Sequence, residues 1–265
     1  MPYPNLAGKH AYDSLITPED LHASLRAEGA FPDLSAVRGA IICYQARIMD
    51  QIATSGSATR VRGVGGENYL VDVGKDGAQI AVCGRFGIGA PVASIVLEDL
   101  IAFGVRRVVS VGTAGCLQRG MAVGDLVLCT SAIRDEGVSY HYIEADAPAL
   151  PHAAMTDQFR AALAARAGER PLHAGPTWTI DAPYRETVEE ARHYQAMGVQ
   201  TVEMEAAALF AVAAHRGIEI ASAFVVSDSL AELVWSPGFR DPLVERGLDT
   251  LYTAASATLL GPTSD

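Results

Sequence analysis

The apolar residues of the chain fall into alternating helix-like and strand-like segments. Residues 206–212 are apolar almost all round a helix, and Gly217 is a suitable stop for it. Residues 218–226 then form an apolar strand that ends abruptly in Ser227 and Asp228. Nearly continuous apolar strands between helices are typical of a parallel sheet that is covered on both faces. The pattern therefore predicts an α/β domain with a largely parallel sheet.

The same pattern places the other elements. Thr17, a proline and two acids predict the start of a helix that ends near Gly29. Residues 55–67 are small, polar and glycine-rich, which predicts a loop, and residues 145–156 are the only candidate linker. The expected strands are 37–44, 68–73, 78–83, 107–111, 126–130 and 172–180, with a turn at 74–77; the expected helices are one ending near 53, 90–103, 157–167, 186–197 and 242–260.

Two glycine-rich segments, 84–89 (GRFGIG) and 112–115 (GTAG), follow predicted strands. Glycine allows the backbone to approach a ligand closely, and the helix after the first segment presents free N–H groups to an anion. Neither segment matches a complete phosphate-loop or dinucleotide motif, so tight connections between elements remain the alternative. The Arg85 guanidinium is a natural phosphate partner, and Thr113 adds a hydroxyl donor.

Three carboxylates interrupt the apolar C-terminal half: Glu203 and Glu205 where the helix begins, and Asp228 where the next strand ends. Buried carboxylates are costly unless they are paired, hydrogen-bonded or protonated, so the three together suggest a site. The alternative is that the glutamates cap the helix. Because open parallel sheets bind ligands at the carboxyl ends of their strands, one pocket could hold these acids and both glycine-rich segments.

The overall charge restricts the partners. The formal net charge is −11, which argues against nucleic acid or an anionic membrane as a partner. An anionic substrate therefore needs a locally positive pocket. The 19% charged and 49% hydrophobic residues predict a compact globular chain.

The cysteines and the apolar runs indicate the compartment. Four cysteines have no metal-ligand spacing, so we expect small buried thiols and no metal site. The start of the chain lacks a signal-peptide core, and no run reaches the roughly 18 apolar residues of a membrane span. A cytoplasmic protein without contact to a membrane is expected. The four cysteines are Cys43, Cys83, Cys116 and Cys129.

Four motifs together resemble the nucleoside phosphorylase family, which includes purine nucleoside and uridine phosphorylases and, as hydrolytic relatives, nucleosidases. They are VEMEAAALFA (202–211), VVSD (225–228), GIGAPVASIVLEDLIAFGVRRVVSVGTAGCL (87–117) and GDLVL (124–128). The resemblance covers roughly residues 68–260. It implies a single domain over 1–265, a three-layer α/β/α sandwich around a mixed, largely parallel sheet. Residues 1–16 are polar and irregular, which predicts an N-terminal arm. The resemblance also implies a homo-oligomer, either a dimer or a hexamer.

The resemblance assigns roles to the acids. Glu205 resembles the glutamate that binds the ribose hydroxyls, Met204 resembles the methionine that lines the sugar, and Glu203 precedes them in the same motif. Asp228 resembles the acid of the purine-acting members, which protonates or hydrogen-bonds N7 of the departing base. The chemistry agrees, because glycosidic cleavage creates positive charge on the sugar and the purine must not leave as an anion.

The phosphate site departs from the family pattern. Thr113 matches the hydroxyl residue that contacts phosphate, but Ser110 stands where many phosphorylases have an arginine, as in the nucleosidases, which lack it. The glycine-aspartate-proline loop is absent from residues 38–45. Arg85 could compensate, with Gly87 in the same glycine-rich segment. Arg62, or Arg60 beside it, could reach the phosphate of a neighbouring subunit.

For the base, Trp178 and Tyr184 lie where the family stacks an aromatic ring, and ordinary core aromatics are the alternative. The glutamine-arginine pair that binds uracil in uridine phosphorylases is not evident. His10 lies on the arm, where a solvated histidine is the simpler interpretation.

We therefore expect phosphorolysis of a nucleoside, in particular a purine nucleoside, to free base and ribose 1-phosphate. Inorganic phosphate would be the co-substrate, and no cofactor or metal is expected. A uridine phosphorylase, a phosphate-independent nucleosidase and a non-catalytic nucleoside-binding protein remain alternatives.

Overall fold

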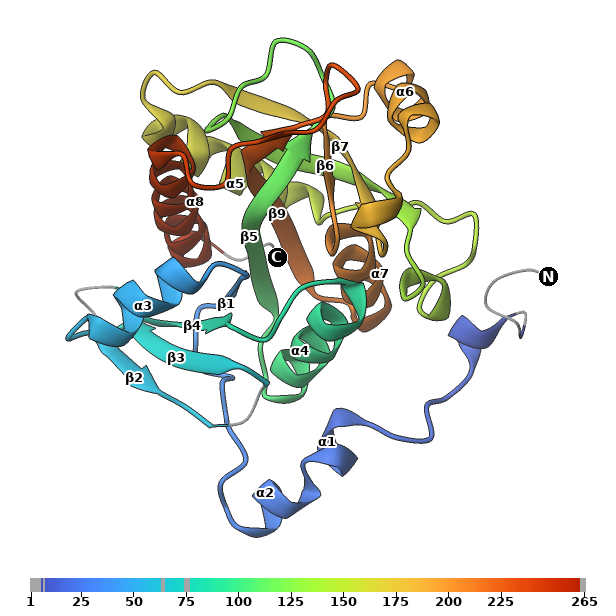
Figure 1. The fold of residues 1–265 in the computed structure, drawn as a ribbon. Helices are drawn as coiled ribbons and strands as arrows, with labels where there is room; N and C mark the ends of the chain where they lie inside the picture. The colour runs from blue at the N-terminus through green and yellow to red at the C-terminus, as the bar shows by residue number, and fades with distance from the viewer. Residues whose placement is uncertain (1–5, 7, 63–64, 74–76, 263–265) are drawn as a thin grey trace.

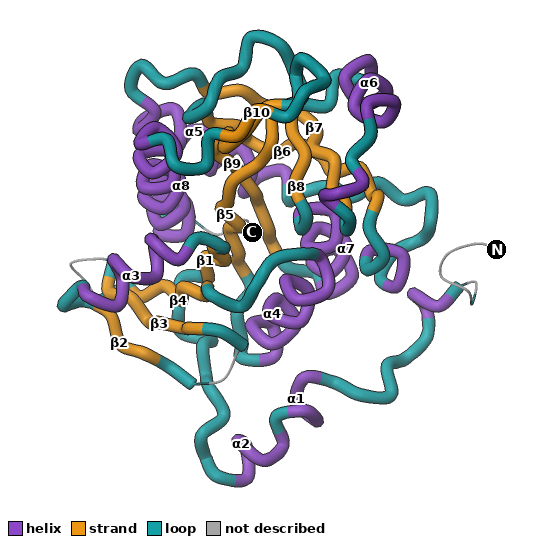
Figure 2. The backbone as a smooth tube through the Cα atoms, viewed as in Figure 1, coloured by secondary structure: helices purple, strands orange, loops and turns teal. Residues whose placement is uncertain are grey.

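The computed structural model describes residues 6, 8–62, 65–73 and 77–262. Helices lie on both sides of one mixed sheet, as Figures 1 and 2 show. The strands of this sheet are β1 (Ala40–Cys43), β2 (Ala58–Arg60), β3 (Glu67–Asp72), β4 (Gln79–Gly84), β5 (Arg107–Cys116), β6 (Leu126–Asp135), β7 (Leu172–Ile180), β8 (Thr201–Glu203), β9 (Glu219–Ser229) and β10 (Ser236–Pro237).

Helices alternate with these strands along much of the chain. The predicted helix at 186–197 is observed as α6, and its Thr187 cap explains where it starts. The helices are α1 (Pro18–Leu21), α2 (Ala23–Ala27), α3 (Ala46–Thr54), α4 (Ala90–Ala102), α5 (Ala153–Ala167), α6 (Val188–Ala196), α7 (Ala206–Arg216) and α8 (Pro242–Leu260), with short 3-10 turns η1 (Lys9–Ala11), η2 (Ser139–His141) and η3 (Pro183–Arg185).

The sheet is mixed, as predicted, and its long strands pair both in parallel and, between β6 and β9, antiparallel. The strand order is β10-β9-β6-β7-β8-β5-β1-β4-β3-β2, and β5 also pairs with β9. Parallel pairs join β5 to β9, β6 to β7 and β1 to both β4 and β5, whereas β2, β3 and β10 pair antiparallel at the two ends. The additional β5–β9 pairing closes β5, β9, β6, β7 and β8 into a ring. The sequence pattern gave no sign of this closure.

Two apolar layers cover the sheet. On one side, α4 and α7 pack on each other and bury leucine, valine and phenylalanine side chains against the strands. On the other side, α5 and α8 pack together, with α3 nearby, over a second buried cluster. Figure 2 shows the two pairs of helices on opposite sides of the strands. The three-layer α/β/α architecture is therefore confirmed.

Several boundaries differ from the prediction. The helix expected from Thr17 to Gly29 breaks at His22, whose ring bonds Asp99 at 3.0 Å and packs on Phe103, so tertiary contacts override local propensity. The predicted loop at 55–67 contains the edge strand β2. The candidate linker ends early, because α5 begins at 153. The predicted turn at 74–77 lies mostly outside the described residues.

The second glycine-rich segment is the main correction. Residues 112–115 were expected to form a turn, but they lie within β5, which continues to Cys116. The first part of β5 pairs with β1, and its end, at Gly115 and Cys116, pairs with β8 after an irregularity. These glycines therefore serve close packing rather than chain reversal.

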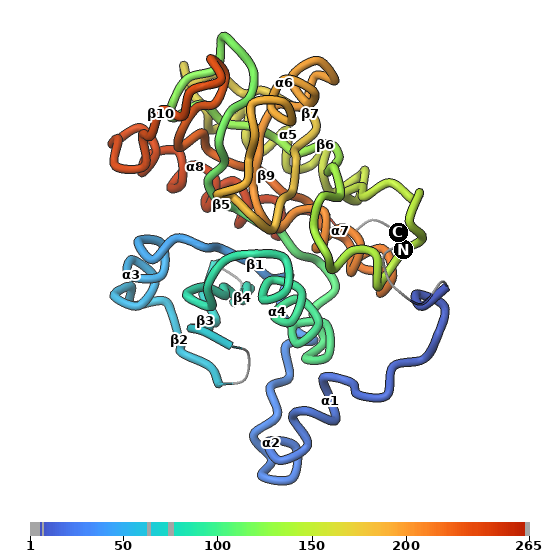
Figure 3. The backbone as a smooth tube through the Cα atoms, turned by 45° about the vertical axis from the view of Figure 1, so that its right-hand side comes forward, coloured from blue at the N-terminus to red at the C-terminus, as the bar shows by residue number. Residues whose placement is uncertain are grey.

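The N-terminal arm lies outside this body. In Figures 1 and 3 it runs along the outside of the molecule before the chain enters β1. The described residues of the arm are exposed or half-buried. Lys9 Nζ lies 2.7 Å from His141 Nδ1, and His10 Nε2 lies 3.7 Å from Glu144 Oε1. The arm thus contacts the body through polar groups of its own chain.

Within the described ranges, no helix is both long enough and apolar enough to cross a bilayer. The four cysteines are buried and unbonded, as predicted. Burial raises the pKa of each thiol, which keeps it protonated.

Candidate active site

Glu205 is held by the start of another helix. It lies two residues after the end of β8 and is the N-cap residue of α7. Its Oε1 accepts a hydrogen bond of 2.5 Å from the backbone N–H of Gly89, the N-cap residue of α4. Gly89 has φ 100°, which favours glycine, and a Cβ there would lie 3.9 Å from Met204 Cε. The anion at this helix start is thus the protein's own carboxylate, with Met204 beside it.

Glu203 has its hydrogen bonds satisfied inside the protein. Its Oε2 accepts from the N–H groups of Glu205 and Ala206 at 2.8 Å each, and its Oε1 accepts from the Thr179 hydroxyl at 2.5 Å. Glu203 therefore supports the start of α7, which is the capping alternative that the sequence left open.

The two glutamates affect each other's ionisation. Burial, followed by the nearby Glu205 charge, raises the pKa of Glu203 to about 8. Burial also raises the pKa of Glu205 to about 7, against the opposing effect of the Gly89 hydrogen bond. Only part of this pair is ionised near neutral pH, as is typical of carboxylates that share a buried space.

Asp228 lies at the end of β9 and is almost buried, with 8% of its surface exposed. The Ser227 hydroxyl donates to Oδ1 at 2.7 Å, and the indole N–H of Trp235 donates to Oδ2 at 2.9 Å. A Cβ at Gly115 would lie 3.1 Å from Asp228 Oδ2 and 2.9 Å from Leu230 Cδ1. Gly115 thus leaves the room in which the carboxyl lies, and Trp235 is a contact that sequence reasoning missed.

Thr113 of β5 lies beside two residues that the sequence analysis missed and that follow the end of β1. The Gln45 side-chain amide donates to Thr113 Oγ1 at 3.1 Å, and the Tyr44 hydroxyl lies 3.2 Å from Ser110 Oγ. A Cβ at Gly112 would lie 3.0 Å from the Tyr44 ring, so this glycine makes room for the tyrosine. Ser110, which the resemblance aligns with the arginine of many phosphorylases, is therefore bonded to Tyr44.

Tyr44 also lies close to the glutamates. Burial, followed by the charge of Glu205, raises the pKa of Tyr44 well above its usual value, so the hydroxyl stays protonated. Its ring meets Phe86 edge-on, with centroids 5.5 Å apart. Phe86 directly follows Arg85, so the first glycine-rich segment borders the same region.

The other phosphate candidates lie further out. Arg85 has φ 55°, and its guanidinium pairs with Asp50 of α3 and, at 3.4 Å, with Glu67 of β3. No hydrogen bond joins it to Thr113 in the described structure. Gly87 has φ 102° in the same segment, and Arg62 is exposed beyond β2. The structure thus places Thr113 with the carboxylates but directs Arg85 toward acids of α3 and β3.

The base-stacking candidates are not brought together. Trp178 has no exposed surface, donates to Asp135 Oδ2 at 2.9 Å and packs against Tyr194 with centroids 4.6 Å apart. It has the contacts of the core aromatic that the sequence left open. Tyr184 of η3 is fully exposed. It could reach a ligand, whereas Trp178 would first have to leave its packing.

Glu186 is a further acid in this region. It follows η3, is half-buried, and has a pKa raised to about 7 by burial, then by the charges of Asp228 and Glu190. The sequence analysis singled out only the aromatic residues of WTIDAPYRET (178–187) and missed this glutamate.

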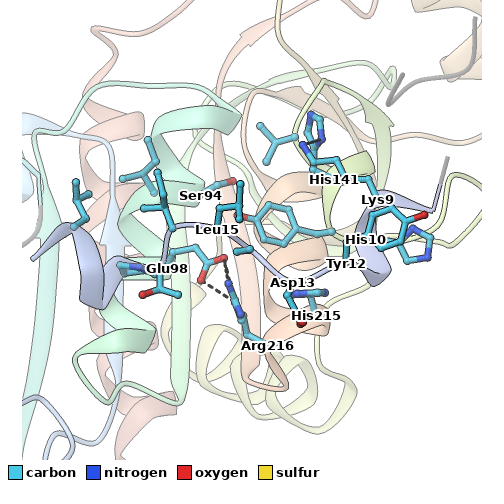
Figure 4. A pocket seen from close by; sticks show the side chains of 18 of the residues that line it. Lys9, His10, Tyr12, Asp13, Leu15, Ser94, Glu98, His141, His215 and Arg216 are labelled. Atoms are coloured by element: carbon cyan, nitrogen blue, oxygen red, sulfur yellow. Dashed lines mark hydrogen bonds and ion pairs between the residues drawn. The ribbon is translucent and has the colours of Figure 1, made fainter. Parts of the chain in front are cut away.

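The pocket in Figure 4 lies away from these carboxylates. It measures about 760 Å³ between the arm and the surface of α4 and α7, with His10, His215 and Ser94 in its lining. Arg216 crosses it to bond Glu98 at 2.9 Å. None of the strand-end carboxylates lines it, so its size does not identify the active site.

No cluster of three or more histidine, cysteine or acidic side chains that could hold a metal occurs among the described residues. The residues at the strand ends instead offer two carboxyl groups, hydroxyls and amides, which suit a sugar and a heterocyclic base.

The family model described as the phosphorylase superfamily matches residues 40–250. The chain belongs to the phosphorylase superfamily. All of the strand-end residues named above, from Tyr44 to Trp235, lie within the matched range. The family assignment therefore rests on the same part of the chain as the candidate site.

The sequence of this superfamily member is similar to those of several named phosphorylases. It is 33% identical over 195 residues to a guanosine phosphorylase from Halorubrum lacusprofundi, covering 73% of this chain and 79% of that protein. It is 32% identical over 157 residues to a uridine phosphorylase from Salmonella typhimurium, covering 54% of this chain and 61% of that protein. A DeoD-type purine nucleoside phosphorylase from Myxococcus xanthus is 34% identical over 160 residues, which cover 58% of this chain and 64% of that protein.

Among solved structures, the uridine phosphorylase from Vibrio fischeri superposes with a TM-score of 0.72. The match covers 87% of this chain and 95% of that structure, at 23% identity. It supports the fold of this superfamily member.

Proposed function

We propose that the chain is a nucleoside phosphorylase that cleaves purine nucleosides to free base and ribose 1-phosphate. The observation that carries the proposal is the placement of Glu205 and Asp228 at the ends of β8 and β9, with Thr113 of β5 beside them. The relatives, which are named guanosine, uridine and purine nucleoside phosphorylases, support the reaction class.

Glu205 would orient the sugar. The Glu205 carboxylate, held at Oε1 by the Gly89 N–H, would accept from the ribose hydroxyls, with Met204 against the apolar side of the ring. As the bond between C1′ and the base breaks, positive charge develops on the ribose, and a nearby carboxylate stabilises it.

Asp228 would act on the base. Phosphate oxygen forms the new bond to C1′ while the C1′–N9 bond breaks and its electron pair moves into the purine. A proton at N7 then prevents the base from leaving as an anion, and a carboxyl that donates it supplies general acid catalysis. Ser227 and Trp235 would hold the side chain in position.

Phosphate would bind around Thr113. The Gln45 amide and the Thr113 hydroxyl are neutral donors at this point, and Arg85 is our candidate for the cationic contact. Asp50 and Glu67 now occupy its guanidinium, so phosphate binding would require a change of partner. Arg62 is proposed to act on a neighbouring subunit's phosphate.

Hydrolysis is the second candidate. The observation that favours it is the Ser110–Tyr44 contact, which occupies the position of the family's usual arginine with neutral groups. A site without that cation suits a neutral nucleophile, water, better than it suits phosphate.

A panel of inosine, guanosine, adenosine, uridine and methylthioadenosine, each with and without phosphate, tests the proposal. We expect cleavage of the purine nucleosides only when phosphate is present. Preferential cleavage of uridine would refute the purine assignment. Equal cleavage without phosphate would refute phosphorolysis, and nucleoside binding in calorimetry without any product would favour a binding protein.

The biological setting is part of the proposal. We place the activity in purine salvage in the cytoplasm, with one domain over 1–265 assembled as a homo-oligomer. The buried, protonated thiols support a reducing compartment.

A further inference from the structure

A second pocket lies at the edge of the sheet opposite the strand-end carboxylates. It measures about 490 Å³ and lies where β5 and β9 begin, with Gly104 and Gly217, which follow α4 and α7, in its lining. Because α4 has 13 residues and is therefore roughly 20 Å long, the pocket is well separated from Gly89 at the other end of this helix. Its occupant would be a ligand other than the nucleoside.

This pocket is positively charged in a chain whose net charge is −11. Arg38, Arg106 and Arg107 line it, and Glu219 is the only acid among the described residues of its lining. Arg107 Nε donates to Glu219 at 2.9 Å, and the other two nitrogens donate to Gln158 and to backbone carbonyls at the end of α8. Because Arg107 neutralises Glu219, the charges of Arg38 and Arg106 remain.

Both remaining guanidinium groups have N–H donors without a partner in the described chain. Arg106 Nη1 donates to the carbonyls of Ile101 and Val105 at 2.9 Å each, which offsets the partial negative charge at the end of α4. No hydrogen bond or ion pair within the described ranges involves its Nε or Nη2, or any side-chain nitrogen of Arg38. Both arginines are exposed, so these donors are open to a ligand from solution.

The sheet fixes the two arginines at the starts of neighbouring strands. Ala40 of β1 pairs in parallel with Val108 of β5, and each arginine lies two positions before this pair. Gly39 allows the close approach, since it has φ 150° and a Cβ there would lie 2.5 Å from a backbone oxygen of β5. Like charges held on adjacent strands repel each other, and an anion bound between Arg38 and Arg106 would remove this repulsion.

We propose that this pocket is a second oxyanion site, which binds a tetrahedral phosphate group between Arg38 and Arg106. The paired N–H donors of a guanidinium match the geometry of phosphate oxygens. The volume also has room for a sugar, so the group is either free phosphate or the phosphate of a small monoester. The site is independent of the proposed reaction, because none of the strand-end carboxylates lines it.

Equilibrium dialysis with radiolabelled inorganic phosphate tests the site. It compares the wild type with Arg38→Gln, Arg106→Gln, the double variant and Arg166→Gln. Arg166 is the matched control because it is an exposed arginine whose Nη1 also donates to a helix carbonyl, that of Ala162 at 3.0 Å. We expect the wild type and the control to bind one phosphate per chain more than the double variant. Each single variant should bind this phosphate at least about tenfold more weakly, as for a lost hydrogen bond to a charged group.

Counting a difference between variants separates this site from the catalytic one. A phosphate in the active site adds equally to every variant, so a wild type without phosphorolysis would refute the proposed function and leave the difference of one phosphate intact. Equal phosphate binding in the wild type, the control and the double variant would overturn the second site, whatever the activity. Circular dichroism checks folding, and the single variants carry the comparison if the double variant is unfolded.

Competition with ribose 5-phosphate identifies the form of the ligand. Displacement of the second phosphate at lower concentrations than unlabelled phosphate requires would assign the site to a monoester, and displacement at equal or higher concentrations would assign it to free phosphate. Failure of unlabelled phosphate to displace the label would overturn the site.

Discussion

At the scale of single residues, Glu205 and Glu203 each accept a hydrogen bond from a distant part of the chain, whereas the donors to Asp228 are close to it in the sequence. Gly89 binds Glu205 across 116 positions, and Thr179 binds Glu203 across 24. Asp228 depends on Trp235 and on the space that Gly115 leaves for it. Their chemistry therefore depends on strand ends that the sheet brings together.

Asp228→Asn tests the acid. The amide keeps the shape of the side chain but cannot deliver a proton to N7, so kcat for a purine nucleoside should fall by roughly a hundredfold. Asp157→Asn, on an exposed side chain of α5, is the control and should leave kcat unchanged. Steady-state kinetics with thermal denaturation checks both variants, and unchanged turnover in Asp228→Asn would exclude the residue from the mechanism.

Gly115→Ala tests the space beside Asp228. The new Cβ would approach the flexible end of Leu230 at 2.9 Å and Asp228 Oδ2 at 3.1 Å, so the carboxyl must move by a few tenths of an ångström. We expect about a tenfold or larger loss of kcat, because misplacement of a catalytic group is costly, with a small change in thermal stability. Gly56→Ala, where a Cβ meets open space, is the control. Full activity in Gly115→Ala would show that the position of Asp228 is not tightly set.

The sequence singled out the acids but not their partners. Glu203, Glu205 and Asp228 stand out because they interrupt apolar segments. Tyr44 and Trp235 were missed because nothing local marks them. Tyr44 contacts Ser110 and Trp235 contacts Asp228. These contacts form only once the strands are paired. Trp178, singled out as an aromatic, has the contacts of the core instead.

At the scale of elements, α7 begins on a buried carboxylate. Glu203 accepts from the first N–H groups of the helix, and α7 itself is almost entirely buried. The helix start therefore combines a favourable cap with an acid whose ionisation is opposed by burial and by Glu205.

This arrangement makes stability depend on pH. The pKa values of Glu203 and Glu205 in the folded protein, about 8 and about 7, lie above the ordinary 4.5, so folding binds protons. Their contribution is fully present below pH 4.5 and is lost as the pH rises through 7 and 8. Each pKa unit corresponds to about 1.4 kcal/mol.

Glu203→Gln should remove most of the part that Glu203 contributes to the loss of folding stability at rising pH. The amide oxygen can still accept from Glu205 and Ala206, and Thr179 can turn to accept from the amide, so the fold should persist. Denaturant unfolding at pH 5, 6, 7 and 8 measures the effect. A wild-type stability that rises over this range would contradict the assignment of the raised pKa values.

Element types were more predictable than element ends. Apolar periodicity predicted α4, α7, α8 and the long strands, because burial on one or both faces leaves a clear pattern. The prediction of a turn at residues 112–115 was wrong because glycine is common both in turns and where side chains pack closely on a strand. The Tyr44 ring beside Gly112 shows that close packing is the reason here. The break at His22 likewise depends on Asp99, which is distant in the sequence.

At the scale of the whole molecule, the closed ring of β5, β9, β6, β7 and β8 brings the carboxyl ends of β8 and β9 to the same region as β5. Its net charge of −11 opposes an anionic substrate, so phosphate must be bound by local donors. Arg85, the proposed cationic contact for phosphate, is paired with two acids instead. Whether the enzyme uses phosphate is therefore the central question about its function.

The most direct measurement is ³¹P NMR of the wild type incubated with inosine and inorganic phosphate, with hypoxanthine measured in the same sample. We expect ribose 1-phosphate and hypoxanthine in equal amounts, and no hypoxanthine when phosphate is omitted. Hypoxanthine released with free ribose, at the same rate with and without phosphate, would contradict phosphorolysis and identify a hydrolase.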